Sequence, residues 1–189
     1  PLPRPLLDAI RSPPLEFLDP VTAVQETVKV IQANEAVDII VCVSHSGTWD
    51  DEEKSEDEIL AKSVPELDLI ISGHTHTRLD EPIQHGDTYI VSAAEYGKYL
   101  GNLTMSQQAN GRWKMDKYDL ITVDETIEED AETKERVDTF LDMVDNKYLE
   151  QFGYTTDQVF CTNDIAFSTS GEVGSKHTEM NLGSIMADA

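Results

Sequence analysis

The sequence is poor in cysteine, in basic residues and in long apolar runs. Its two cysteines, Cys42 and Cys161, do not form a CxxC pair, which argues against a disulfide framework and a thiolate zinc site. No apolar run reaches the roughly 18 residues that a membrane span requires. Lysine and arginine total 14 against 37 acidic residues, and the formal net charge is −23. Because such a field repels phosphate backbones, we do not expect a nucleic-acid duplex as a partner.

The bulk composition is that of a folded protein. The chain has 189 residues, 39% of them hydrophobic, which is enough for one sizeable domain, or for one domain and a piece of another. The acidic balance still permits a small phosphorylated substrate, because a local cation can reverse the sign of the field in a pocket. We find no signal-peptide pattern at the N-terminus and no internal repeat.

The first part of the chain predicts a layered α/β domain. Residues 1–14 form a Pro-rich lead-in with five of the eight prolines. Asp19 and Pro20 then suit the cap and first position of a helix whose apolar residues repeat at helical spacing. Continuous apolar runs at 37–43 and 67–72 predict two buried parallel strands. Between them, Ser55 and Glu58 form a capping-box pattern for a short helix to about residue 64.

The second part changes character. Alternating patterns at 87–93, 99–106 and 112–123 predict an antiparallel meander, with a hairpin turn at Asn110-Gly111. A capping-box pattern at Thr126 and Glu129 predicts a long helix to about residue 152, which would suit an interdomain connector. Residues 158–167 are strand-like, and the segment NLGSIMADA at the C-terminal end has the pattern of a helix start.

Three histidines follow the two predicted parallel strands. His45 comes after the first strand, and His74 and His76 come after the second. Since open α/β sheets bind ligands beyond the carboxyl ends of their strands, we expect these imidazoles to converge. Histidines two residues apart in an extended segment point the same way and could reach two neighbouring ions. Gly47 and Gly73 would let the backbone approach those ions closely.

The other polar residues have simpler interpretations. A single histidine after a strand is usually a structural polar residue, so the metal hypothesis depends on the group of three. We expect His85 and His177 to be solvated loop residues. The acidic run 50–53 is interpreted as an exposed loop, and Trp49 either packs over the site or anchors that loop.

The segments that carry these histidines resemble a known family. VDIIVCVSHSG (37–47), LDLIISGHTHT (67–77) and VSAAEYGKYLG (91–101) are similar to the second half of the calcineurin-like metallophosphoesterase domain. The resemblance is closest to the 5′-nucleotidase and 2′,3′-cyclic-nucleotide phosphodiesterase family. LEFLDPVTAVQETV (15–28) fits the preceding helix, and NLGSIMADA (181–189) resembles the opening of the family's C-terminal domain.

The resemblance implies a fold and a domain order. The expected fold class is α/β: the second half of a four-layer α/β/β/α metallophosphoesterase sandwich, a long linker helix, and the start of an α+β C-terminal domain. In these terms the lead-in is 1–14, the half-domain 15–125, the linker helix 126–153 and the truncated C-terminal domain 154–189.

The resemblance also implies a metal centre. His45 and His74 would bind one divalent ion of a pair, and His76 would bind the other. In the family such ions hold the phosphate and activate a water molecule for attack on phosphorus. Imidazole ligands suit zinc, manganese or iron, so the identity of the two ions stays open.

Several family motifs do not occur in this sequence. Asp-x-His, Gly-Asp and Gly-Asn-His-Glu would lie upstream of residue 15, and the aromatic residues that stack on substrate would lie after residue 189. We therefore expect a fragment of a larger enzyme, with no catalytic residue besides the metal ligands and with no activity of its own. Its exposed sheet would be covered by the missing half of the domain or by another chain.

The leading hypothesis is a secreted or surface 5′-nucleotidase-type hydrolase, acting on nucleotides or other small phosphorylated substrates. One alternative is a 2′,3′-cyclic-nucleotide phosphodiesterase or a broad phosphatase of the same fold. Another is a non-catalytic acidic extracellular binding module. From the family resemblance we expect the protein to lie outside the cell, at the cell surface or in the periplasm.

Overall fold

The computed structural model describes residues 17–159, 162, 164–167 and 180–188. It divides into two compact units, Pro1–Glu128 and Glu129–Ala189. In the described parts of the first unit, the helices and strands are α2 (Pro20–Asn34), β1 (Val41–Val43), α3 (Glu56–Ser63), β2 (Leu69–Ile71), β3 (Ile83–His85), β4 (Thr88–Val91), β5 (Tyr99–Gln107) and β6 (Trp113–Thr122). None of the described helices combines the length and the apolarity that a membrane crossing requires.

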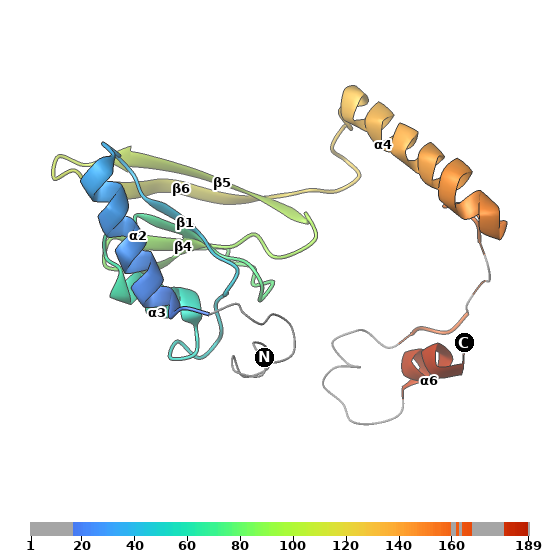
Figure 1. The fold of residues 1–189 in the computed structure, drawn as a ribbon, viewed down its shortest axis with the longest axis horizontal. Helices are drawn as coiled ribbons and strands as arrows, with labels where there is room; N and C mark the ends of the chain where they lie inside the picture. The colour runs from blue at the N-terminus through green and yellow to red at the C-terminus, as the bar shows by residue number, and fades with distance from the viewer. Residues whose placement is uncertain (1–16, 160–161, 163, 168–179, 189) are drawn as a thin grey trace. The chain divides into compact units, whose positions relative to one another are not determined.

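The main sheet of the first unit is mixed. Its strand order is β1-β2-β4-β3, with β1, β2 and β4 parallel and β3 antiparallel to β4 (Figure 1). The predicted parallel pair is confirmed, with Val43 opposite Ile71. The predicted meander is wrong in part, because β4 joins the parallel sheet and only β5 and β6 form a separate antiparallel hairpin. Strand β3 was not predicted, because its three residues are too few to show an alternation.

Helices α2 and α3 cover one face of this sheet. Helix α2 begins as predicted, with the Asp19 side chain accepting a hydrogen bond from the backbone N–H of Thr22. The buried core that the two helices share with the sheet consists of Val28, Leu60, Ala61, Val64, Leu67, Ile70 and Ile90. Because each Å² of apolar surface removed from water contributes about 25 cal/mol, this cluster stabilises the unit.

The predicted capping box of α3 is wrong. Ser55 is the N-cap residue, but its side chain makes no capping hydrogen bond. Its Oγ instead accepts a hydrogen bond from the backbone N–H of Trp49, and Glu58 hydrogen-bonds to His85. Both side chains therefore serve tertiary contacts that a local pattern cannot show.

The β5–β6 hairpin is fixed against the main sheet at several points. The Asn110-Gly111 turn is confirmed, with Gly111 at φ +82°. Trp113 Nε1 donates to the carbonyl of Asp38 at 2.6 Å, and the Tyr118 hydroxyl donates to the carbonyl of Ser92 at 3.2 Å. These bonds join β6 to the main sheet along its length.

The described part of the second unit consists of α4 (Ala131–Val144), a π-helical turn (Asp145–Leu149), a 3-10 turn (Glu150–Phe152) and α6 (Asn181–Asp188). The N-cap of α4 is Asp130 rather than Thr126, whose hydroxyl bonds to Asp124 instead. The helical run stops at Gly153, which has φ +75°, as predicted. No strand occurs among the described residues of 158–167, and the remainder of that predicted strand lies outside the described residues.

Candidate metal centre

The ends of β1 and β2 bring His45 and His74 together. The ladder between the two strands continues one step beyond them, where the backbone N–H of Ser44 donates to the carbonyl of Ile71 at 2.9 Å. The two imidazole rings lie edge to face with their centroids 5.0 Å apart, and both side chains are exposed. A single ligand at this edge of the sheet can therefore contact both rings.

The backbone around the histidines is in an uncommon conformation. Among the described residues, four non-glycine residues have positive φ: His74, His76, Ala94 and Tyr96. They lie in the two loops that follow β2 and β4, at the carboxyl edge of the parallel strands. Each such residue costs on the order of 1–3 kcal/mol, and such strain gathers at functional sites. The conformation is thus independent support for a site at this edge.

His76 lies beside a different ring. Its centroid is 5.4 Å from that of Tyr96, which is 85% exposed. The ammonium of Lys98 lies 5.8 Å from the centroid of the same tyrosine ring and pairs with Glu95. The hydrogen bond from Lys98 holds the pKa of Glu95 below its usual range. The structure therefore pairs His45 with His74, and His76 with Tyr96.

Two threonines alternate with the histidines and anchor their loop. Thr75 Oγ1 accepts from the backbone N–H of Thr48 at 3.2 Å, and the Thr77 hydroxyl donates to the carbonyl of Thr48 at 3.2 Å. The two threonine hydroxyls are 2.9 Å apart. The loop after β2 is thus fastened to the loop after β1. The hydroxyl of Thr48 itself is buried without a partner among the described residues.

Asp57, in helix α3, connects the same two strand ends through hydrogen bonds. Its carboxylate accepts hydrogen bonds from Ser44 Oγ and Ser72 Oγ, each at 2.5 Å, and from the backbone N–H of Gly47 at 3.0 Å. The residue is fully buried in the first turn of α3. Sequence reasoning missed it. The available signal was an acidic residue within the helix, paired with a serine directly after each of the two apolar strands.

His85 is not the loop residue that we expected. It ends β3, is partly buried, and its Nε2 lies 2.8 Å from Glu58 Oε2 and 3.7 Å from Glu52 Oε1. The ligand atoms of these three residues lie within 4.8 Å of one another, which is compact enough for a metal ion. Lys62 already pairs with Glu52, however, so we interpret the cluster as an ion-pair network. His177 lies outside the described residues.

A cavity opens beside the His45–His74 pair. It has a volume of about 370 Å³, and it is lined by His45, Ser46, Trp49, Lys54, Glu56 and His74. The acidic run 50–53 is exposed, as expected, and lies outside this lining. The cavity gives a small ligand access to both imidazoles.

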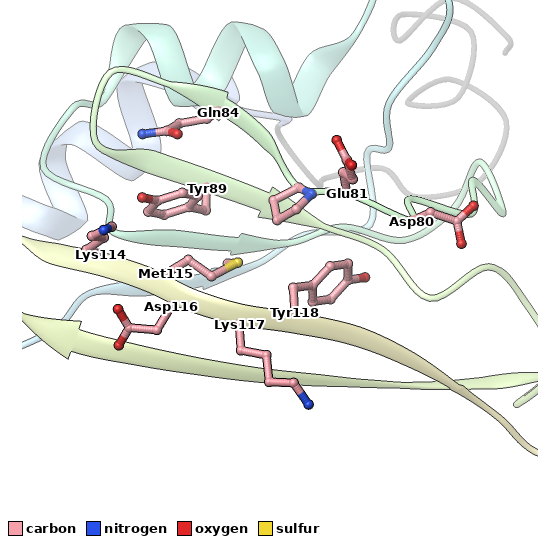
Figure 2. Close-up of a pocket in the computed structure, with 10 residues that line it drawn as sticks. Asp80, Glu81, Gln84, Tyr89, Lys114, Met115, Asp116, Lys117 and Tyr118 are labelled. Carbon is pink, nitrogen blue, oxygen red and sulfur yellow. The ribbon is translucent and has the colours of Figure 1, made fainter.

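A second cavity of about 370 Å³ lies between the main sheet and the hairpin. Figure 2 shows Tyr89 of β4 facing Met115 and Tyr118 of β6, with charged side chains at the margins. No histidine lines this cavity, so it does not belong to the histidine site.

Comparison with known proteins identifies the family. No family model matches the chain. It is 36% identical over 178 residues, or 91% of its length, to the trifunctional nucleotide phosphoesterase protein YfkN of Bacillus subtilis. It is also 31% identical over 132 residues, or 58% of its length, to the 5′-nucleotidase of Vibrio vulnificus. The chain belongs to the 5′-nucleotidase-type calcineurin-like phosphoesterases.

A solved structure supports the same relationship. The 5′-nucleotidase precursor of Thermus thermophilus superposes with a TM-score of 0.58 at 26% identity, over 70% of this chain and 28% of its own. The chain spans only 11% of the Bacillus protein and 24% of the Vibrio enzyme. It therefore corresponds to part of these relatives.

Proposed function

We propose that this chain supplies part of the metal centre of a phosphohydrolase that cleaves phosphate monoesters of nucleotides. His45 and His74 bind one divalent ion, and His76 binds a second. The observation that carries the proposal is the 5.0 Å separation of the His45 and His74 rings at the carboxyl edge of a parallel sheet. Two imidazoles at that separation can each direct one nitrogen to a common ion.

The donor set fits a divalent transition metal. Among the described residues, neither His45 nor His74 hydrogen-bonds to a protein group through its ring, whereas the His85 ring is engaged by Glu58. Exposed imidazoles with free nitrogens are suited to zinc, manganese or iron. The ions would supply Lewis-acid activation of the phosphate and of water. The chain's own part is to hold His45 and His74 in the wall of a cavity that admits a small substrate, with His76 two residues further along the same loop.

The names of the relatives support nucleotides as the substrate class. The Vibrio relative is named a 5′-nucleotidase, and the Bacillus relative is named a trifunctional nucleotide phosphoesterase. The second name favours a runner-up, a phosphodiesterase or broad phosphatase of the same fold acting on nucleotides. Release of phosphate from 5′-AMP compared with hydrolysis of 2′,3′-cyclic AMP by the complete protein would separate the two.

We further propose that the chain is the second half of a four-layer phosphoesterase domain (15–125), joined by a connector helix (126–153) to the start of a C-terminal domain (154–189). The exposed apolar side chains of the main sheet support this, since Val43 of the edge strand β1 is 80% exposed. The missing half, or another chain, would cover that surface and complete the metal ligands. An extracellular, surface or periplasmic location is proposed from the family resemblance.

The proposal is tested in the complete protein. With Mn²⁺ present, His74→Ala should lower phosphate release from AMP by about 100-fold or more, because it removes a ligand of the activating ion. His85→Ala, at a histidine outside the site, is the matched control and should retain activity. The chain expressed alone should release no phosphate. Equal activity of His74→Ala and the wild type would contradict the proposal.

A further inference from the structure

We propose that Asp57 is a positioning residue, one that holds His45 and His74 at the separation that a shared metal ion requires. The inference rests on the proposed function, since it assumes that the two imidazoles bind one ion. Asp57 touches neither histidine directly. It acts on the backbone that carries them.

The geometry connects Asp57 to both strand ends. Oδ1 accepts from Ser44, the residue before His45, and Oδ2 accepts from Ser72, two residues before His74. Oδ2 also accepts from the backbone N–H of Gly47, two residues after His45. The backbone N–H of Asp57 donates back to the carbonyl of Gly47 at 3.2 Å. One carboxylate thus holds two serine hydroxyls and one backbone N–H, all within two residues of the two imidazoles.

The three donors require an acceptor at both oxygens. The backbone N–H of Gly47 can only donate a hydrogen bond. An asparagine NH₂ group in the place of Oδ2 would therefore point its own hydrogens at that N–H. An asparagine at position 57 would therefore place its NH₂ toward Ser44, which would have to give up its donated bond. The change keeps the size of the side chain, but the Ser44 hydroxyl can then only accept from that NH₂ group, so the bond to a charged oxygen is lost at the β1 end, where His45 lies. Because the group is fully buried, water cannot replace the lost bond.

A second buried carboxylate joins the same strands at their other end. Asp68 precedes β2, is 6% exposed, and its Oδ2 accepts from the backbone N–H of Ile40 at 2.9 Å, just before β1. Asp57 and Asp68 thus connect β1 and β2 at opposite ends, and only Asp57 is close to the histidines. Asp68→Asn is therefore a matched control for the structural cost of removing a buried carboxylate.

The test measures Mn²⁺ binding by isothermal titration calorimetry in the complete protein, for the wild type, Asp57→Asn and Asp68→Asn, with thermal unfolding recorded for each. We expect Asp57→Asn to weaken Mn²⁺ binding about tenfold or more, the scale at which supporting residues act on metal sites. Asp68→Asn, whose amide oxygen can still accept from Ile40, should leave Mn²⁺ affinity unchanged, and its unfolding temperature shows what removing a buried charge alone costs. Ser44→Ala removes only one of the three donors to Asp57, so it should also weaken Mn²⁺ binding, but less than Asp57→Asn does. Equal Mn²⁺ affinities for the two Asn variants would overturn the positioning role.

A crystal structure of Asp57→Asn separates this inference from the proposed function. If the wild type binds Mn²⁺ but the ring separation stays at 5.0 Å in the variant, the positioning role is wrong and the metal site stands. If the wild type binds no Mn²⁺ while the rings move apart in the variant, the proposed function is wrong and Asp57 still sets the spacing.

Discussion

In the loop after β2, exposed and partly buried residues alternate along the chain. His74 and His76 are exposed, whereas Thr75 and Thr77 are partly buried and hydrogen-bond to Thr48 in the loop after β1. This division needs the close approach of Gly47, where a Cβ would lie 2.3 Å from Thr75 Cγ2. The small residue thus permits the contact that holds the histidine loop in place.

Gly47→Ala should therefore be costly. Its φ of +93° and the contact with Thr75 add strain and a clash, and we expect the free energy of unfolding to fall by roughly 2 kcal/mol or more. Gly111→Ala is the control, because Gly111 has φ +82° but open space around it, and should cost about 1 kcal/mol. Urea denaturation of the complete protein measures both. Equal losses of unfolding free energy in the two variants would show that the contact with Thr75 adds nothing to the cost of Gly47→Ala.

The candidate histidines could be predicted from sequence, but the residues that support them could not. His45, His74 and His76 follow apolar runs, so their place at a sheet edge follows from local pattern. Asp57 lies in a helix 10 or more residues from the groups it binds, and its partners depend on how that helix packs. These partners depend on tertiary packing, which the periodicity of apolar residues does not reveal.

Among the helices, the capping residues were also hard to predict from sequence. Both predicted capping boxes followed the pattern Ser/Thr-x-x-Glu, and neither forms. Ser55 and Glu58 are drawn into contacts with Trp49 and His85, and Thr126 bonds to Asp124. Asp19 caps α2 as predicted. Apolar periodicity located most helices and strands, while their ends depended on competing hydrogen bonds.

Helix α4 should lose helicity in acid through its cap. Hydrogen bonds from the side chain and backbone of Thr133 hold the pKa of Asp130 below its ordinary value of 3.8. A lowered pKa in the folded state means that the ionised cap stabilises the helix above that ordinary value. The contribution is lost as the pH falls through the lowered pKa. In a peptide of residues 126–153, circular dichroism should show an acid loss of helicity.

Asp130→Asn provides the control for that experiment, because asparagine also caps helices but does not titrate. The variant peptide should lose less helicity than the wild type between about pH 5 and about pH 2. The neighbouring acidic residues are common to both peptides and cancel in the difference. Superimposable pH curves would rule out a contribution from the Asp130 carboxylate.

In the whole molecule, the main sheet exposes apolar side chains that the proposed complete domain would bury. Val41, Val43 and Ile71 are 42%, 80% and 41% exposed, on the edge strand β1 and its neighbour β2. Open edges and apolar faces promote association. The relatives are four to nine times longer than the part that matches, consistent with additional chain covering this face.

The chain alone should therefore self-associate. Val43→Lys should reduce the association, because it places a charge on the apolar face, and light scattering after gel filtration measures the change. Val30→Lys is the control, since Val30 is also exposed, at 60%, but belongs to helix α2 and not to the sheet. A monodisperse wild-type monomer would contradict the view that another segment covers this surface.

The most direct test of the metal centre is the anomalous scattering of zinc in crystals of the complete protein. We expect a peak between the rings of His45 and His74, with one nitrogen of each at about 2.0–2.1 Å. A peak confined to the Glu52–Glu58–His85 cluster, or none near either ring, would contradict it.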